Sequence, residues 1–167
     1  MINELPEIEL AVIGGVIQNV DKYNDIAKYI VDDSVWDENK SRILWKIISG
    51  MIKRREHVDM ITITSTLTEE DKVLGVDALF VVDCTNNSAT KSSLEIYAKK
   101  MYEQYLLRCV AAQAKDIQEA AEDNKVDALD VLVSAHTSIG ELISLRPDNT
   151  FNIDDALGDA IESIQNT

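Results

Sequence analysis

The sequence predicts an all-α protein with a small multi-helix head, a long antiparallel helical hairpin and a short C-terminal linker helix. Apolar residues recur at three- and four-residue steps through most of the 167 residues, which is the spacing of one helix face. Helix caps and Gly or Pro breaks separate these segments. We assign the head to residues 1–90, the hairpin to residues 91–146 and the linker to residues 147–167.

The first helix of the head is marked by Pro6 and the acidic residues that follow it, and we expect it to end near Asn19. Gly14 and Gly15 lie inside this helix. Each costs about 1 kcal/mol relative to alanine, so we expect the backbone of another segment to approach closely there.

Two more head helices follow. The first is expected to begin with a cap at Asp21 and to continue to Ile30. The second has apolar residues on one face from Ile43 to Ile52 and basic residues on the other.

Short elements complete the head. Residues 60–64 alternate like a strand, but the cap at Asp59 favours a short helix. Residues 68–71 resemble a capping box, residues 77–82 form an apolar helical turn, and residues 85–88 are expected to be a loop.

The hairpin helices, predicted at 91–122 and 126–145, carry more apolar surface than a helix pair can bury between its members. The second helix has two apolar stripes. Stripe A comprises Leu129, Leu132, Ile139 and Ile143, and stripe B comprises Val131, Ala135, Leu142 and Leu145.

This surplus apolar surface allows two interpretations. One stripe contacts its partner helix and the other contacts a second chain, or both pack on the same small domain. If the first holds, the residues expected at the subunit interface are Leu94, Tyr97, Met101, Tyr105, Leu106, Cys109, Val110, Leu132, Ile139 and Leu142.

The linker begins at Pro147, which ends the second hairpin helix. Apolar residues at helical spacing then predict a short amphipathic helix that needs a surface to pack on. The residues expected to dock it are Phe151, Ile153, Leu157 and Ile161.

The net charge of −14 and the aromatic content of 5% argue against tight nucleic-acid binding by this chain, since phosphate binding needs clustered Lys and Arg. From Asp116 onward the only cations are Lys125 and Arg146. This uneven charge could orient contacts with partners or simply keep one face solvated.

Catalytic motifs are missing from the sequence. It contains no GxxxxGK(S/T), GxGxxG, HExxH, GxSxG or CxxC pattern, and we assign no catalytic, cofactor-binding or metal-binding residue. Cys84 and Cys109 suit buried free thiols of a reducing cytosol, and His57 and His136 are expected at the surface. With no membrane span or signal peptide, we expect a cytoplasmic protein.

Five segments in order resemble the N-terminal domain of DnaB-type bacterial replicative helicases. Residues 6–17 resemble its opening EAExAVLGAIL pattern, residues 41–48 its HRxIFxAI helix and residues 58–62 its VDxVT step. Residues 97–98 and residues 106–108 resemble its YA and LLR landmarks.

The sequence departs from that pattern at three places. Ser41 replaces a histidine, Arg55 stands where glycine is common, and residues 35–36 replace an aromatic pair. These packing and turn positions suggest a divergent version of the domain, for instance one from a phage or mobile element, and leave a chromosomal origin open.

The resemblance implies a collar in which hairpins pair into dimers and six subunits form a ring. It also implies docking of a primase or helicase loader, and a linker helix that packs on a neighbouring motor domain. The parent would be an ATP-dependent 5'-to-3' DNA helicase, with ATP, Mg²⁺ and single-stranded DNA bound by a motor ring beyond Thr167. The chain alone would have no enzymatic activity. The alternatives are a stand-alone collar mimic that regulates a helicase, or an unrelated helical adaptor.

Overall fold

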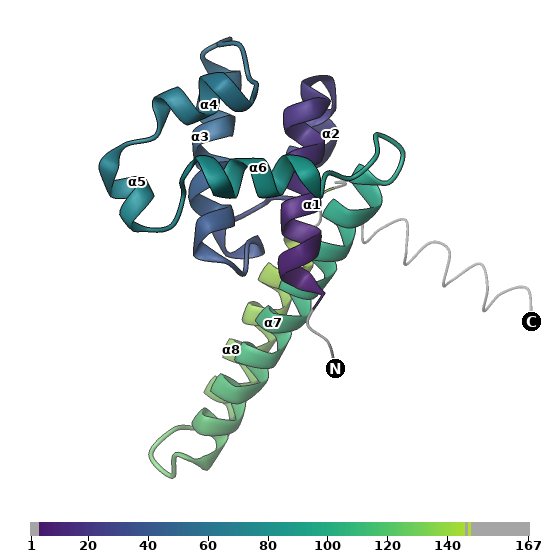
Figure 1. Cartoon of the computed structure of the whole chain (residues 1–167). Coiled ribbons are helices and arrows are strands. Elements are labelled where there is room, and N and C mark those ends of the chain that lie inside the picture. Colours follow the sequence, from purple (N-terminus) through teal and green to yellow (C-terminus); the bar gives the residue numbers. More distant parts are fainter. Residues whose placement is uncertain (1–3, 146, 148–167) are drawn as a thin grey trace, which may run out of the picture.

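The computed structural model describes residues 4–145 and Pro147, and this part of the chain is all helical, without a strand. A compact head carries a helical hairpin that projects away from it (Figure 1). The predicted fold class is confirmed. The elements are α1 (Leu5–Gln18), η1 (Val20–Lys22), α2 (Tyr23–Ala27), η2 (Asp33–Val35), α3 (Asn39–Lys53), α4 (Met60–Thr66), α5 (Glu69–Val73), α6 (Ala78–Asn86), α7 (Leu94–Glu122) and α8 (Ala128–Ser144).

Helix α1 lies at the centre of the head and packs against α3, α6 and α7. The side chains of Val12, Ile13 and Val16 are completely buried. A Cβ atom on Gly14 would lie 1.8 Å from the carbonyl oxygen of Cys84, and one on Gly15 would lie 2.6 Å from Leu94 Cδ1. The paired glycines therefore let α6 and the start of α7 touch the α1 backbone, as the sequence predicts.

The two capping boxes explain why the short helices form. Asp59 accepts from the backbone nitrogen of Thr62, and the Thr62 hydroxyl accepts from the backbone nitrogen of Asp59. Thr68 and Asp71 make the same reciprocal pair at α5. The cap outweighs the strand-like alternation of residues 60–64, and the helix prediction there is confirmed.

Two predicted elements differ from the structure. The segment expected to form one helix from Asp21 to Ile30 is a 3₁₀ turn followed by α2, which ends at Ala27. Asp21 is not a helix cap: its carboxylate pairs with Lys91 at the base of the hairpin, 2.5 Å away.

The second difference is the end of α6, which continues to Asn86 instead of stopping near Val82. The Thr85 hydroxyl donates to the Val82 carbonyl oxygen at 2.8 Å, and the side-chain amide of Asn87 donates to the Asp83 carbonyl oxygen. The side-chain amide of Asn87 thus adds a hydrogen bond to one of the last carbonyl groups of the helix.

The hairpin is anchored in the head through the first turns of α7, whose residues Leu94, Met101 and Tyr105 are buried there. Helix α8 then returns antiparallel to α7 (Figure 1). The Tyr102 hydroxyl donates to the carbonyl oxygen of Leu145 at 2.9 Å. The end of α8 is therefore held beside the head, while the tip of the hairpin points away.

Candidate subunit interface on the helical hairpin

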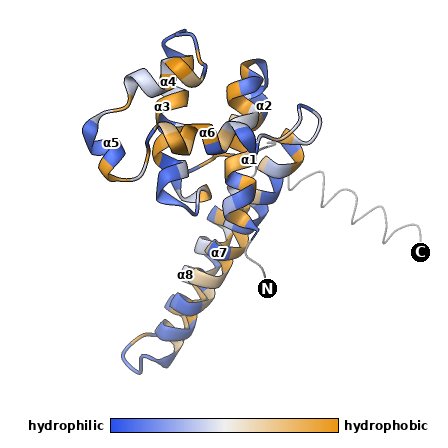
Figure 2. Ribbon diagram, in the orientation of Figure 1, coloured by the Kyte–Doolittle hydropathy of each residue, from blue (hydrophilic) through white to orange (hydrophobic). Residues whose placement is uncertain are grey.

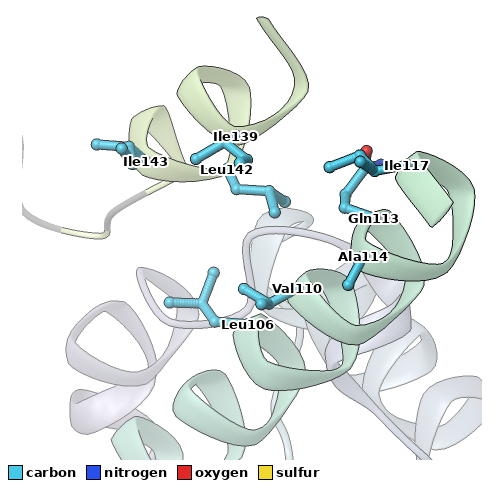
Figure 3. Close-up of a pocket in the computed structure, with 8 residues that line it drawn as sticks. All are labelled: Leu106, Val110, Gln113, Ala114, Ile117, Ile139, Leu142 and Ile143. Atoms are coloured by element: carbon cyan, nitrogen blue, oxygen red, sulfur yellow. The ribbon is translucent and has the colours of Figure 1, made fainter. Parts of the chain in front are cut away.

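An apolar groove of about 280 Å³ lies between α7 and α8, beyond the part of α7 that packs into the head. Figure 3 shows its side chains, which reach toward one another from the two helices. All of them are apolar except Gln113. The lining residues are Leu106, Val110, Gln113, Ala114, Ile117, Ile139, Leu142 and Ile143.

The structure distinguishes the two stripes of α8. The members of stripe B are all partly buried against the rest of the chain. Stripe A is exposed: the exposed fractions are 66% for Leu129, 66% for Leu132, 47% for Ile139 and 45% for Ile143. Helix α8 has no buried residue at all, and hydrophobic residues recur along the hairpin outside the head (Figure 2).

Stripe A has the spacing of a helix-pairing surface. Its residues follow alternating three- and four-residue steps once the exposed His136 is counted between Leu132 and Ile139. This is the heptad spacing that keeps one face of a helix against another helix. On α7, Leu107 and Val110 are 60% and 53% exposed, and they extend the apolar surface beside the groove.

The predicted interface residues divide into two groups. Leu94 and Met101 are completely buried in the head and Tyr105 is 8% exposed, so these three have no surface to offer a second chain. They belong to the core because the first turns of α7 pack on α1. The others are partly or fully exposed, and they are Tyr97, Leu106, Cys109, Val110, Leu132, Ile139 and Leu142. The predicted docking residues Phe151, Ile153, Leu157 and Ile161 lie outside the described residues.

The titratable side chains give no sign of a catalytic centre in the part of the chain that the structure describes. Burial raises the pKa of the Cys84 thiol to about 12, so it stays protonated and unreactive. Cys109 is half-buried, and both histidines are exposed. No group of three or more His, Cys, Asp or Glu residues is placed to hold a metal ion within residues 4–145. Over the same range, no helix is long and apolar enough to span a bilayer.

Two residues lie in segments that the sequence analysis named, Glu9 and Arg108, but their contacts in the head were not predicted. The Glu9 carboxylate is completely buried and accepts hydrogen bonds from the backbone nitrogens of Asp37 and Glu38. Its spacing to the apolar residues of α1 could have placed it on the buried face. The Arg108 guanidinium donates to the carbonyl oxygen of Ser34 at 2.7 Å and ties the hairpin to η2. No local sequence signal marks that contact.

The comparisons with known proteins agree with this fold. The model of the DnaB-like helicase N-terminal domain matches residues 2–103, which is more than half of the chain. The chain belongs to this family. The match covers the head and the first turns of α7 of this DnaB-like domain.

Two relatives extend the comparison. The replicative DNA helicase DnaC of Bacillus subtilis is 25% identical over 161 residues, which cover 95% of this chain and 35% of that protein. The N-terminal domain of DnaB helicase from Mycobacterium tuberculosis has a TM-score of 0.71 at 17% identity. That match covers 81% of this chain and 96% of the solved one, so the shared fold extends beyond the head.

The structure shows the surroundings of two residues that depart from the DnaB-like family pattern. Ser41, which replaces a histidine, is 1% exposed, and its side chain hydrogen-bonds the buried Glu9 carboxylate. Arg55 stands where glycine is common and adopts a φ of 60°. That is the left-handed region, in which a residue with a Cβ atom is strained.

Proposed function

We propose that this chain is the collar domain of a replicative DNA helicase, in which the hairpin pairs subunits into dimers and then into a ring. The proposal depends on stripe A, which is apolar, exposed and has heptad spacing. It lies on α8, a helix that has no buried residue. Membership of the DnaB-like family and the similarity to the Bacillus subtilis replicative DNA helicase support it.

The exposed stripe has a physical reason to pair. Completely burying a Leu or Ile side chain contributes about 1.5–3 kcal/mol, so covering the half-exposed residues of stripe A contributes about 1 kcal/mol each. A two-fold arrangement presents the same stripe from both subunits, which doubles the number of buried side chains. Such a gain is large enough to offset part of the entropy lost on association.

The parent protein is proposed from the relatives. It would be an ATP-dependent 5'-to-3' helicase whose motor ring binds ATP and Mg²⁺ and encloses single-stranded DNA, acting in the cytoplasm. The collar would dock a primase or a helicase loader. The chain spans 35% of the length of the Bacillus subtilis helicase, and the gene sequence after Thr167 tests this part of the proposal. A P-loop there supports a helicase, whereas a stop codon supports a stand-alone collar mimic.

The assembly is tested by light scattering on the chain from low to high micromolar concentration. We expect dimers or larger rings, and Leu132→Asp should dissociate them because a carboxylate would be buried in an apolar contact. Leu79→Asp is the matched control, since Leu79 lies on α6 of the head and is 68% exposed, close to the 66% of Leu132. A wild-type chain that stays monomeric throughout, or equal effects of the two variants, would contradict hairpin pairing.

A further inference from the structure

A second pocket lies on the head, between α2, η2 and α3, and shares no residue with the groove of the hairpin. Its volume is about 470 Å³. One wall contains the rings of Tyr23 and Trp45, which are stacked with centroids 5.4 Å apart. Ala27 and Ile30 continue this apolar wall from the side of α2. The pocket therefore has room for an apolar side chain.

Gly50 lines this pocket. It lies inside α3, where glycine costs about 1 kcal/mol relative to alanine. A Cβ atom at Gly50 would meet only the flexible tip of Arg54, at 3.1 Å from Nη1. Unlike Gly14, which touches the backbone of another helix, Gly50 has no close packing within the described chain that requires it.

Polar groups without partners also face this region. Ser49 lines the pocket, is 8% exposed, and its hydroxyl has no hydrogen-bond partner among the described residues. A buried hydroxyl without a partner is uncommon in a folded protein. Lys53 lines the pocket as well and makes no ion pair within the described part of the chain, while Lys46 pairs with Asp33 at 2.6 Å.

We propose that this pocket binds an acidic segment of another protein through one apolar anchor side chain. The anchor occupies the space beside Tyr23 and Trp45, and a carboxylate of the segment pairs with Lys53 at the rim. Lys53 is a cation without an ion pair among the described residues, beside a pocket with an aromatic wall, on a chain with a net charge of −14. Charge complementarity therefore selects an acidic partner at this position.

A nucleic acid fits the same surface less well. Phosphate backbones need several clustered cations along their path, whereas this rim offers only Lys53 and Lys46, and Lys46 is already paired with Asp33. A free phosphate would leave the apolar wall uncovered.

The test uses a fluorescein-labelled peptide of three aspartates followed by leucine and phenylalanine, with binding to the full chain followed by anisotropy. We expect saturable binding that weakens at least tenfold in Lys53→Glu and is lost in Gly50→Leu, which fills the pocket. Lys99→Glu is the matched control, because Lys99 is exposed on α7 and does not line the pocket. Circular dichroism checks the fold of each variant, and Lys53→Glu carries the test if Gly50→Leu does not fold.

Two competitors identify the occupant. We expect unlabelled peptide to displace the probe, and a peptide of aspartates alone to displace it at least tenfold less well. The proposal would be overturned if the probe did not bind saturably or if the aspartate peptide competed equally well. Displacement of the probe by inorganic phosphate or single-stranded DNA would also overturn it. An equal loss of binding in Lys99→Glu would overturn it too. The hairpin variants test a separate surface, so failure here leaves the assembly proposal intact.

Discussion

The Glu9 carboxylate in α1 lies 3.2 Å from the backbone nitrogen of Glu38. Glu38 is the N-cap residue of α3. The contact joins two helices through a buried acid. Burial raises the pKa of Glu9, and the hydrogen bonds from Asp37, Ser41 and Glu38 offset only part of that shift.

This relationship predicts a pH dependence of stability. Because the folded state holds the Glu9 proton more tightly than the unfolded state, the contribution of Glu9 to the free energy of unfolding is greatest below its ordinary pKa of 4.5. That contribution falls as the pH rises through the raised pKa and is constant above it. Glu9→Gln does not titrate, so the stability of the wild type relative to this variant should fall over the same window. Urea denaturation at a series of pH values measures the difference, and a rise with pH would contradict the assignment.

Two glycines should respond to alanine in opposite ways. Gly14→Ala places its Cβ 1.8 Å from the Cys84 carbonyl oxygen, so we expect a loss of about 2 kcal/mol or more. A Cβ on Gly140 meets nothing within 4 Å, so Gly140→Ala should stabilise α8 by about 0.5–1 kcal/mol through helix propensity. Urea denaturation at two protein concentrations separates these effects from any change in association. Equal effects at the two sites would contradict the close contact at Gly14.

Arg55→Gly should stabilise the chain. Arg55 has a φ of 60°, a backbone conformation that costs a residue with a side chain about 1 kcal/mol. Glycine removes this strain, but its larger backbone entropy in the unfolded state cancels part of the gain in stability. We expect a net increase of about 0.5 kcal/mol in thermal or urea unfolding. Arg54→Gly is the control, because Arg54 has a φ of −81° and should gain nothing.

Met101→Asp and Leu132→Asp should separate folding from assembly. Met101 is completely buried in the head, so an aspartate there should reduce the helical circular dichroism and the stability of the monomer. Leu132 is 66% exposed, so its variant should keep the helical signal and lose only association. A folded Met101→Asp chain would show that α7 is not part of the head core.

The isolated chain should neither hydrolyse ATP nor hold single-stranded DNA at physiological salt. Its net charge of −14 allows only weak binding that falls steeply as salt rises. A phosphate-release assay and a salt titration of labelled DNA check these two expectations. Tight binding at physiological salt would contradict the charge argument.

Local signals accounted for most of the helices. The caps at Asp59 and Thr68 depend on contacts within a few residues, and the structure confirms them. The start of α2 was misplaced because Asp21 pairs with Lys91, which is distant in sequence. Local propensity carries no information about such a partner.

The hairpin shows the same limit at its candidate interface. Stripes A and B have equivalent helical spacing, so the pattern alone could not decide which one faces α7. Likewise, Met101 and Leu106 are both apolar positions of one helix, yet Met101 is completely buried and Leu106 is only partly buried against the core. How far α7 runs along the head decides this, and Arg108 makes a further contact with the head through the carbonyl oxygen of Ser34. The pocket at Gly50 was also missed, since its walls come from separate elements.

The bond from the Tyr102 hydroxyl to the Leu145 carbonyl oxygen has a mechanical consequence. Both ends of the hairpin are attached at the head, and its tip is attached to nothing within the described chain. Tension applied to the polypeptide at Leu145 is therefore borne by the base of α7 and the head core. A pull on the chain at Leu145 meets this contact and the base of α7 before it reaches the distal turns.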